Sequence, residues 1–348
     1  MATPPTTSTI KVALAGAGWA GQVHTLAAAA VPGITIPAVA TRSLESARAF
    51  AELVGGEGVG IEELPAAADA VVVATPPTSH ADIAVAMLER GVPVLVEKPL
   101  ACTLAEADAI VDAAQRNGVA ACYAENLLFA PALDLAAAKR ATLGPLKHLS
   151  VRTVQPTPDW GHFADDLTVG GALFDLGPHA LAVLMVLAGE EPVALRAKLD
   201  SSRADGADDT ARVEVRFASD LIAAVDVAWG GEVVDWSAQA AASDGVVRVE
   251  FQPNLAVEFN GEPVPLASAV PSGSDVDARV FDYGYQPQLD GFVGVVKGRG
   301  GRVAPVGFGR SVLDMICAAY ASAGQESAEV PLPFPGPRNL TPMQLWKG

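Results

Sequence analysis

The sequence predicts two domains, a doubly wound parallel α/β sheet followed by an α+β domain whose large sheet is mostly antiparallel. Three observations support this fold class. Short apolar runs alternate with helix-like segments from residue 10 to about 125, which is typical of a parallel sheet covered by helices. From residue 146 onward, strand-like segments follow one another with few helices between them. The length of 348 residues is sufficient for two domains of ordinary size.

A glycine-rich turn joins the first strand to the first helix. The apolar run 10–15 leads to Gly16, Gly18 and Gly21 in G-x-G-x-x-G spacing, and a helix-like segment continues to residue 30. Such glycines permit a tight turn, let the backbone approach a pyrophosphate and allow close packing of helix on strand. The alternative is a structural turn without a ligand. We expect a Rossmann-type dinucleotide site that includes Gly16, Gly18, Trp19, Ala20 and Gly21.

The second strand, residues 34–41, ends where the ribose of a dinucleotide would bind. Thr41-Arg42-Ser43 stands there instead of the Asp or Glu that accepts a hydrogen bond from the ribose of NAD. Arg42 can pair with a 2′-phosphate, and the two hydroxyl groups can donate hydrogen bonds to it. These residues therefore predict a preference for NADP over NAD. The alternative is that Ser43 only caps the next helix and that Arg42 is solvated.

The remaining elements of the first domain follow from apolar runs and capping residues. The expected order is helix 44–54, strand 70–75, helix 81–90, strand 93–96, helix 104–117 and strand 119–123. Thr75-Pro76 and Glu97-Lys98 follow two buried strands, at the edge where ligands bind in open α/β sheets. We therefore expect cofactor contacts from Thr75, Pro76, His80, Glu97 and Lys98.

The second domain is expected to cover residues 126–330. Its predicted strands are 146–154, 193–199, 211–217, 221–228, 237–242, 246–251 and 255–259. Ser219-Asp220 and Asn260-Gly261 lie where hairpin turns would fall. Helices are expected at 132–142, 171–187, 288–297 and 309–323, a long loop at 263–287, a proline-rich tail at 331–348 and a flexible tail at 1–9.

Charge and cysteine content restrict the class of protein. The formal charge of −17 and the pI near 4.6 argue against nucleic acid or an anionic membrane as a partner, since either would need a basic surface. Cys102, Cys122 and Cys317 are too few and too widely separated for a disulfide framework. The first nine residues lack the features of a signal peptide, and the apolar runs are too short to span a bilayer. We expect a cytoplasmic protein.

Lys98 is the first candidate catalytic residue. It follows an apolar run at the carboxyl end of an expected central strand. A partly desolvated lysine beside a nicotinamide would have a lowered pKa, and it could polarise a carbonyl oxygen or hold an alcohol during hydride transfer. The alternative is an ion pair with Glu97 or Asp175 that only joins the domains.

Asp175 and His179 are the second candidates. They lie four residues apart on the expected helix 171–187 and therefore share one face, which we expect to be polar. A neighbouring carboxylate would raise the basicity of the imidazole and orient it as the base that takes a hydroxyl proton. The alternatives are a surface contact or part of a zinc site. Because zinc would need further ligands, we assign no metal.

Several motifs together resemble the Gfo/Idh/MocA oxidoreductase family over nearly the whole chain. They are Gly16-x-Gly18-x-x-Gly21 with His24, Thr75-Pro76 with His80, Glu97-Lys98-Pro99, and Gly170-Gly171-Ala172-Leu173-x-Asp175-x-Gly177-x-His179. The resemblance implies that Lys98, Asp175 and His179 form the catalytic set. It also implies NAD or NADP as cofactor, sugars, inositols or related polyols as substrates, an open-faced sheet in the second domain, and a homodimer or homotetramer. Two positions depart from the family pattern: Thr41 replaces a frequent acidic residue, and Ala172 a frequent glycine.

The resulting hypothesis is an NADP-preferring oxidoreductase that moves a hydride between the nicotinamide and a secondary alcohol or ketone of a sugar-like molecule. Lys98 would hold the reacting oxygen, His179 would exchange its proton, and Asp175 would orient His179 and contact hydroxyl groups. The residues expected to contact the substrate are Tyr123, Asn126, Asp159 and Trp160. Two rival functions are a redox-neutral glycosidase that uses NAD transiently and a nucleotide-binding sensor without catalysis.

Overall fold

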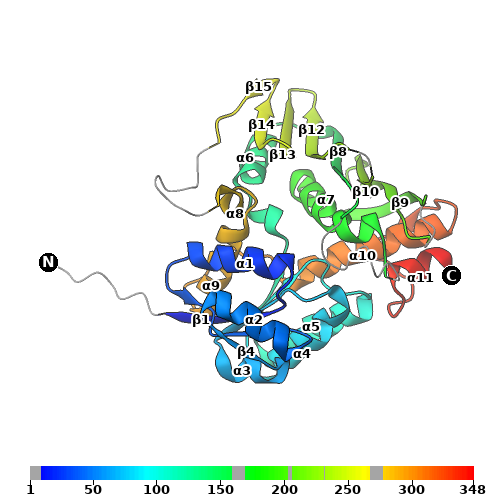
Figure 1. The fold of residues 1–348 in the computed structure, drawn as a ribbon. Coiled ribbons are helices and arrows are strands. Elements are labelled where there is room, and N and C mark those ends of the chain that lie inside the picture. Colours follow the sequence, from blue (N-terminus) through cyan, green and yellow to red (C-terminus); the bar gives the residue numbers. More distant parts are fainter. Residues whose placement is uncertain (1–8, 159–168, 203–205, 231, 267–276) are drawn as a thin grey trace.

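The chain folds around two sheets, one in each predicted domain (Figure 1). The computed structural model describes residues 9–158, 169–202, 206–230, 232–266 and 277–348. The first sheet has seven parallel strands in the order β4-β3-β1-β5-β6-β7, with β2 paired to β1. This confirms the doubly wound sheet expected from the alternating pattern.

The first domain contains the following elements in chain order. They are β1 (Ile10–Ala15), α1 (Trp19–Ala30), β2 (Ile34–Thr35), β3 (Ala38–Ala40), α2 (Leu44–Val54), β4 (Glu57–Val59), η1 (Ile61–Glu63), α3 (Leu64–Ala67), β5 (Ala70–Val73), η2 (Pro77–Ser79), α4 (His80–Glu89), β6 (Val94–Glu97), α5 (Leu104–Asn117) and β7 (Ala121–Ala124). The strand expected at 34–41 is divided into β2 and β3. Pro37 lies between them, and without an N–H group it cannot continue the ladder.

Helices cover both faces of the first sheet because alternate side chains of its strands point to opposite sides. In β1, Val12 and Leu14 belong to one apolar core and Ala13 and Ala15 to the other. All four are nearly inaccessible to solvent. The near-continuous apolar runs of these strands therefore reflect burial on two sides.

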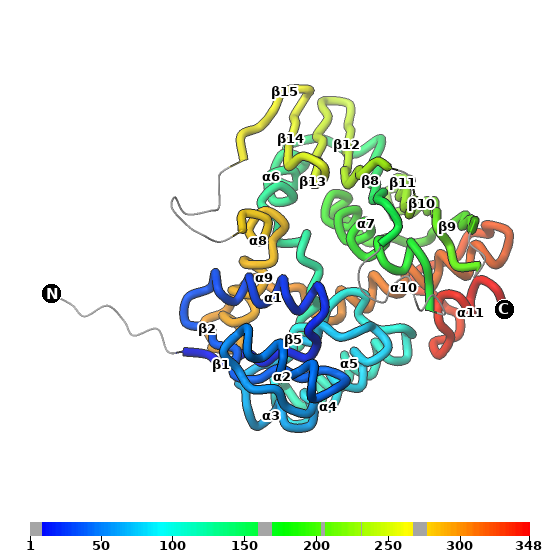
Figure 2. Tube along the Cα trace, viewed as in Figure 1, coloured from blue at the N-terminus to red at the C-terminus, as the bar shows by residue number. Residues whose placement is uncertain are grey.

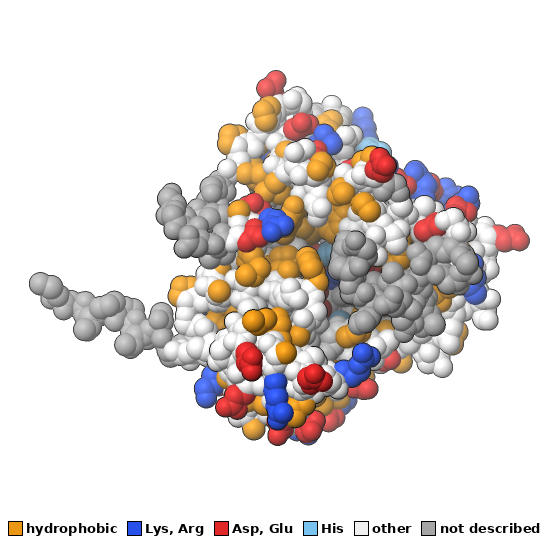
Figure 3. Space-filling model, in the orientation of Figure 1, with side chains coloured by type: hydrophobic (Ala, Val, Ile, Leu, Met, Phe, Trp, Pro, Cys, Tyr) orange, Lys and Arg blue, Asp and Glu red, His pale blue; other side chains and the backbone are white. Residues whose placement is uncertain are grey.

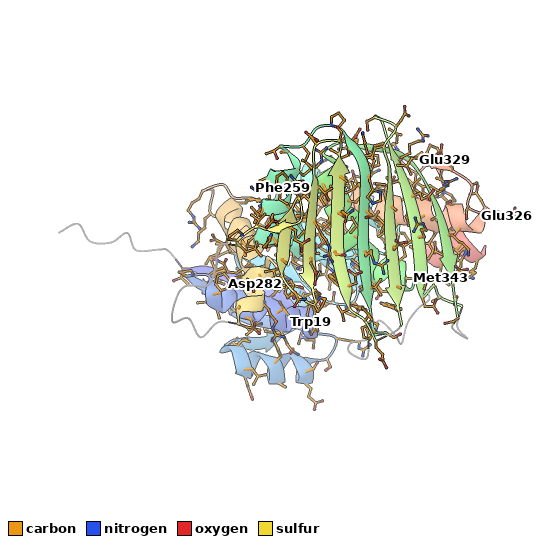
Figure 4. The ribbon with its side chains drawn as sticks, turned by 90° about the horizontal axis from the view of Figure 1, so that it is seen from above. Trp19, Phe259, Asp282, Glu326, Glu329 and Met343 are labelled. Atoms are coloured by element: carbon orange, nitrogen blue, oxygen red, sulfur yellow. The ribbon has the colours of Figure 1, made fainter. Side chains whose placement is uncertain are left out.

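The second domain contains a mixed sheet of nine strands. Its elements are η3 (Asn126–Phe129), α6 (Pro131–Arg140), β8 (Leu146–Gln155), α7 (Ala172–Ala188), β9 (Pro192–Asp200), β10 (Thr210–Phe217), β11 (Ile222–Trp229), β12 (Asp235–Ala242), β13 (Val246–Gln252), β14 (Ala256–Phe259), β15 (Glu262–Pro263) and β16 (Val330–Pro331). The strand order is β15-β14-β13-β12-β8-β11-β10-β9-β16, and only the β8–β11 pair is parallel among the described strands. Helix α7 packs on one face, and Figure 4 shows none of the described helices on the opposite face of the sheet. The sheet is therefore open-faced, as the resemblance implied.

The expected loop 263–287 and the expected tail 331–348 are both partly wrong. The loop contains α8 (Ala278–Asp282) and the first turn of α9 (Tyr285–Val296), and α9 packs beside α1 in the core of the first domain (Figure 2). The tail contributes β16 to the second sheet and forms α11 (Pro342–Lys347), which packs on α10 (Val306–Gly324). Proline content indicated an unstructured segment, but tertiary packing orders it.

Candidate active site

The glycine turn has the geometry that a bound pyrophosphate requires. Gly16 has φ of +112°, and a Cβ there would lie 2.2 Å from the carbonyl oxygen of Ala74. A Cβ on Gly21 would lie 2.4 Å from the carbonyl oxygen of Gly16, whereas one on Gly18 would meet no atom within 4 Å. Gly18 also caps α1 without a side-chain hydrogen bond, so the first N–H groups of the helix remain available to an anion. The turn therefore fits a dinucleotide phosphate.

The structure at the end of the second strand is compatible with both interpretations of Thr41-Arg42-Ser43, helix capping by Ser43 and phosphate binding by Arg42. The Thr41 hydroxyl lies 2.8 Å from the carbonyl oxygen of Ser43 and 2.5 Å from the hydroxyl of Ser46. Ser43 accepts a hydrogen bond from the Ser46 N–H and so caps α2. The exposed Arg42 side chain has no hydrogen bond or ion pair within the described part of the chain. Capping is thus present, and the guanidinium is available for a phosphate.

Two of the expected cofactor residues, His80 and Glu97, form hydrogen bonds to neighbouring elements with their side chains. His80 is fully buried, with its ring nitrogens 2.7 Å from the Thr75 carbonyl oxygen and 2.9 Å from that of Pro99, and burial lowers its pKa. Glu97 is 6% exposed and accepts hydrogen bonds from His24 Nε2 at 2.8 Å and from the next backbone N–H. These contacts hold neighbouring elements together, and a direct contact of either residue with the cofactor stays a prediction.

Two ion pairs connect the first domain to α7. Lys98 Nζ donates hydrogen bonds to Asp175, to Oδ1 at 2.8 Å and to the carbonyl oxygen at 3.1 Å. Glu125, which follows β7, lies with Oε1 2.6 Å from Nδ1 of His179. The three expected catalytic residues therefore meet at one place, together with Glu125. Figure 3 shows histidine atoms near the centre of the molecule, between the two domains.

The register of the first sheet explains why the two pairs form side by side. Strands β6 and β7 are adjacent, and Glu97 at the end of one pairs with Ala124 at the end of the other. The next residues, Lys98 and Glu125, therefore leave the sheet beside each other, and adjacent strands are about 4.8 Å apart. Positions four residues apart on a helix are separated by about 6 Å along its axis. One turn of α7 thus matches two neighbouring strand ends.

The pairing corrects the expected role of Asp175. Its carboxylate binds Lys98, and the carboxylate that orients His179 belongs to Glu125. The expected polar face of the helix is also wrong, since Asp175 and His179 are only 6% and 5% exposed and α7 is buried almost all round. Sequence analysis missed Glu125, although its position directly after a buried strand could have indicated it.

Lys98 is a charged donor rather than a base. Burial is the largest single influence and lowers the pKa of its ammonium group, but the charge and hydrogen bond of Asp175, together with more distant carboxylates, outweigh it. Glu97 and Glu125 act in the same direction, so the pKa of Lys98 is raised above its usual value. The expectation that desolvation would lower the pKa of Lys98 is therefore wrong, because the neighbouring carboxylates decide the sign.

A buried carboxylate holds the first turn of α7 and explains the two glycines before it. Asp208 accepts hydrogen bonds from the N–H groups of Gly171 at 2.9 Å and Leu173 at 2.7 Å, and from the Tyr320 hydroxyl at 2.5 Å. A Cβ on Gly171 would lie 2.0 Å from the Asp208 carbonyl oxygen, and one on Gly170 2.4 Å from the Cβ of Phe174. The sequence indicated the glycines but not Asp208.

The expected substrate contacts are only partly described. Tyr123 is 1% exposed and packs against Gly309 in the core, which corrects its assignment to the substrate pocket. Asn126 is buried and donates a hydrogen bond from Nδ2 to the Tyr283 carbonyl oxygen at 2.7 Å. Asp159 and Trp160 lie outside the described residues.

Among the described residues, no group of three or more His, Cys, Asp or Glu side chains is arranged to hold a metal ion, and no helix is long and apolar enough to cross a membrane.

Fold and site together define a class of enzyme. A glycine turn that fits a dinucleotide phosphate, a charged lysine and an imidazole paired with a carboxylate together suit a dinucleotide-dependent oxidoreductase. Comparison with known families agrees: residues 10–125 match the oxidoreductase family with an NAD-binding Rossmann fold, and residues 136–248 match the Gfo/Idh/MocA C-terminal domain. The chain belongs to the Gfo/Idh/MocA family of NAD(P)-dependent oxidoreductases.

Individual relatives resemble the chain at moderate identity. The rhizopine catabolism protein MocA of Rhizobium meliloti is 32% identical over 57% of this chain, and the chain spans 63% of that protein, less than two thirds of its length. Inositol 2-dehydrogenase of Rhizobium meliloti is 25% identical over 91% of this chain and 98% of that enzyme. The crystal structure of GenD2 from gentamicin A biosynthesis, in complex with NAD, matches with a TM-score of 0.82 and 25% identity, over 95% of this chain and 99% of GenD2.

Proposed function

We propose that the protein transfers a hydride between a nicotinamide cofactor and a secondary alcohol or ketone of a sugar, an inositol or a similar polyol. The observation that carries the proposal is the meeting of Lys98 with Asp175 and of Glu125 with His179 at one place. The resemblance to an inositol dehydrogenase supports the substrate class.

The Glu125 contact supports the proposed role of His179 as a base. Because a carboxylate accepts but does not donate, Nδ1 of the imidazole carries the proton in this pair. The other nitrogen, Nε2, then has a lone pair that can take the proton of a substrate hydroxyl. Glu125 stabilises the imidazolium that results, as the carboxylate of a catalytic triad does.

Lys98 has the complementary task. Its ammonium group stays charged and can hold the oxygen that loses its proton to His179. A bound nicotinamide would supply the hydride acceptor in oxidation and the hydride donor in reduction. In oxidation the substrate carbon loses a hydride, the oxygen loses a proton to His179 Nε2, and a carbonyl forms. Asp175 keeps Lys98 in place through its own carboxylate.

The experiment is a screen of polyols and keto-sugars with NADP and NAD in parallel, followed through the absorbance of the reduced nicotinamide. We expect cofactor reduction by at least one polyol. A product without net oxidation, formed without net cofactor turnover, would indicate the redox-neutral glycosidase. Nucleotide binding without turnover of any compound in the screen would indicate the nucleotide-binding sensor without catalysis.

We further propose a preference for NADP. The support is the exposed guanidinium of Arg42 at the end of the second strand, where the chain has no carboxylate. We expect Arg42→Ala to raise the KM for NADP about tenfold, because it removes a charged hydrogen-bond donor from the 2′-phosphate. The KM for NAD should change little. Equal use of both cofactors by the unchanged enzyme would contradict the role of Arg42.

We also propose that the protein is a homodimer or homotetramer that associates through the open face of the nine-stranded sheet. Opposite charges alternate across neighbouring strands of this sheet. The ion pairs are Arg196–Glu214, Arg212–Asp226 and Arg152–Asp235. Ile222 on β11 is 56% exposed beside them. Light scattering after size-exclusion chromatography should give a multiple of 35.6 kDa, and Ile222→Glu should lower the mass.

A cytoplasmic location is the last element of the proposal. Cys102, Cys122 and Cys317 are buried free thiols, as a reducing compartment permits. Cell fractionation with an antibody to the protein tests this location, and recovery from an oxidising compartment would contradict it.

A further inference from the structure

One segment beyond β16 contacts elements of both domains. It comprises residues 338–346, which we call the domain clasp, and it runs from Arg338 into α11. Helix α11 packs on α10, which itself contacts α5 of the first domain and β9 of the second. Figure 1 shows α10 and α11 at the boundary between the domains. The clasp is therefore placed to fix one domain relative to the other.

On the side of the first domain, the clasp holds the start of α5. The carbonyl oxygen of Arg338 accepts a hydrogen bond from the N–H of Ala105 at 2.7 Å. The guanidinium of Arg338 donates from Nε to Oδ2 of Asp108 at 2.5 Å, and Arg310 of α10 donates to Oδ1 of the same carboxylate at 2.6 Å. Ala105 belongs to the first turn of its helix, where N–H groups have no partner within the helix. The clasp therefore supplies both an acceptor and a cation to this end of α5.

This end of α5 is joined directly to the catalytic lysine. Residues 98–103 connect β6 to α5, and Lys98 is the first of them. Within this connection, residues 100–102 are at most 4% exposed. Because the connection is short and closely packed, a shift of α5 would also shift Lys98.

On the side of the second domain, the clasp reaches the start of α7. The N–H of Met343 donates to the carbonyl oxygen of Val169 at 2.9 Å, directly before the glycines that precede α7. The rings of Trp346 and Tyr320 lie 6.2 Å apart between centroids, with 71° between their planes. The Tyr320 hydroxyl in turn accepts a hydrogen bond from the N–H of Gly171 at 3.1 Å. The clasp therefore supports the beginning of the helix that carries one member of each ion pair.

We propose that the domain clasp sets the position of Lys98 relative to His179, with Arg338 and Trp346 as positioning residues. In the proposed mechanism the ammonium and the imidazole act on the same substrate oxygen, although they come from different domains. A misplacement of about 1 Å can slow such a reaction about a hundredfold. This inference rests on the proposed function and adds a second connection between the domains, outside the site, on which the rate of hydride transfer depends.

The test compares Arg338→Ala and Trp346→Ala with the unchanged enzyme. We expect kcat for the best polyol to fall about tenfold, because the two groups that act on the substrate oxygen lose their mutual placement. The KM for NADP should stay within about twofold, since both substitutions leave the glycine turn unchanged. Rates are taken per NADP-binding site, so that a loss of folded protein does not lower them. Arg338→Lys and Trp346→Phe keep a cation and an aromatic ring, and they should recover most of the lost rate.

A matched control lies at the other end of α5. Arg116→Ala removes an exposed guanidinium there and should change neither kcat nor KM. Unchanged kcat in both clasp variants, with an active unchanged enzyme, would overturn the positioning role and leave the proposed function intact. A fall in kcat together with an equal rise in the KM for NADP would also overturn it, because it would show a general loosening of the fold.

Hydrogen exchange, followed by mass spectrometry, measures the clasp without turnover. We expect each alanine variant to speed amide exchange both in residues 98–108 and in the first turn of α7, because the clasp joins these segments. Faster exchange only in the segment nearest to the substituted residue would contradict the connection. If the unchanged enzyme oxidises no polyol, the proposed function fails, and the exchange result still decides whether the clasp couples the two segments.

Discussion

The two ion pairs at the domain boundary have the same origin but different chemical characters. Each joins a residue that follows a strand of the first sheet to a residue of α7. The Lys98 side chain is 15% exposed and carries a raised pKa, so it presents a fixed positive charge. The Glu125 side chain is completely enclosed, and its partner His179 keeps its second ring nitrogen, Nε2, outside this pair. In the proposed mechanism, one pair therefore supplies a charge and the other a proton acceptor, on the same helix.

Removal of the fixed positive charge of Lys98 should have the largest effect on activity. We expect Lys98→Met to lower kcat about a thousandfold, because the developing charge on the substrate oxygen loses its main donor. Cofactor binding, measured by fluorescence quenching, should change far less. Lys147→Met replaces an exposed lysine of β8 and serves as the control. Activity within tenfold of the unchanged enzyme would show that Lys98 only joins the domains.

Neutralisation of the enclosed carboxylate tests the second pair. The amide oxygen of Gln can still accept the hydrogen bond that Nδ1–H of His179 donates, so Glu125→Gln removes the charge and keeps the orientation of the ring. We expect kcat for oxidation to fall about a hundredfold. Glu89→Gln on the surface of α4 is the matched control, and an unchanged kcat in Glu125→Gln would show that the charge of Glu125 does not assist His179.

Asp208 holds the first turn of α7, and α7 carries the partners of both ion pairs, so its substitution affects both pairs at once. Asp208→Asn replaces an acceptor of three hydrogen bonds by a group with one acceptor oxygen. We expect a loss of about 1–3 kcal/mol in the free energy of unfolding, measured with urea. The fall in kcat should be under about tenfold, since the catalytic groups themselves remain. The exposed Asp112→Asn is the matched control and should leave the unfolding midpoint unchanged. An equally unchanged midpoint in Asp208→Asn would contradict the anchoring role.

The smallest effect is expected from Glu97, which supports the Lys98 side of the site. Burial raises its pKa, but the hydrogen bond and charge of His24 and the charge of Lys98 outweigh burial, so the pKa is lowered. A carboxyl group whose pKa is lowered by folding contributes stability above its unfolded pKa, and this contribution is lost as the pH falls. Glu97→Gln should therefore flatten the acid side of the stability profile below about pH 4.5 and change stability at pH 7 by about 1 kcal/mol. A parallel acid profile, shifted without a change of slope, would be evidence against this linkage.

Local patterns were sufficient for most of the fold. Strand periodicity and turn residues predicted the strands of the second sheet, and left-handed Asp220 and Asn260 occupy the expected hairpin positions. The glycine turn and the strand ends were also evident, because their causes lie within a few residues. The errors occur where distant contacts decide, as in α9, which packs beside α1, and in the tail that forms β16 and α11.

Local sequence was enough to predict the glycine turn, the one-turn spacing of Asp175 and His179 and the place of Lys98 after a buried strand, because each depends on neighbouring residues and on regular helix or strand geometry. Which residue pairs with which follows from the three-dimensional arrangement alone. Lys98 reaches Asp175 across 77 residues, and His179 reaches Glu125 across 54. Such choices depend on how α7 docks against the ends of β6 and β7, and no local pattern contains that information.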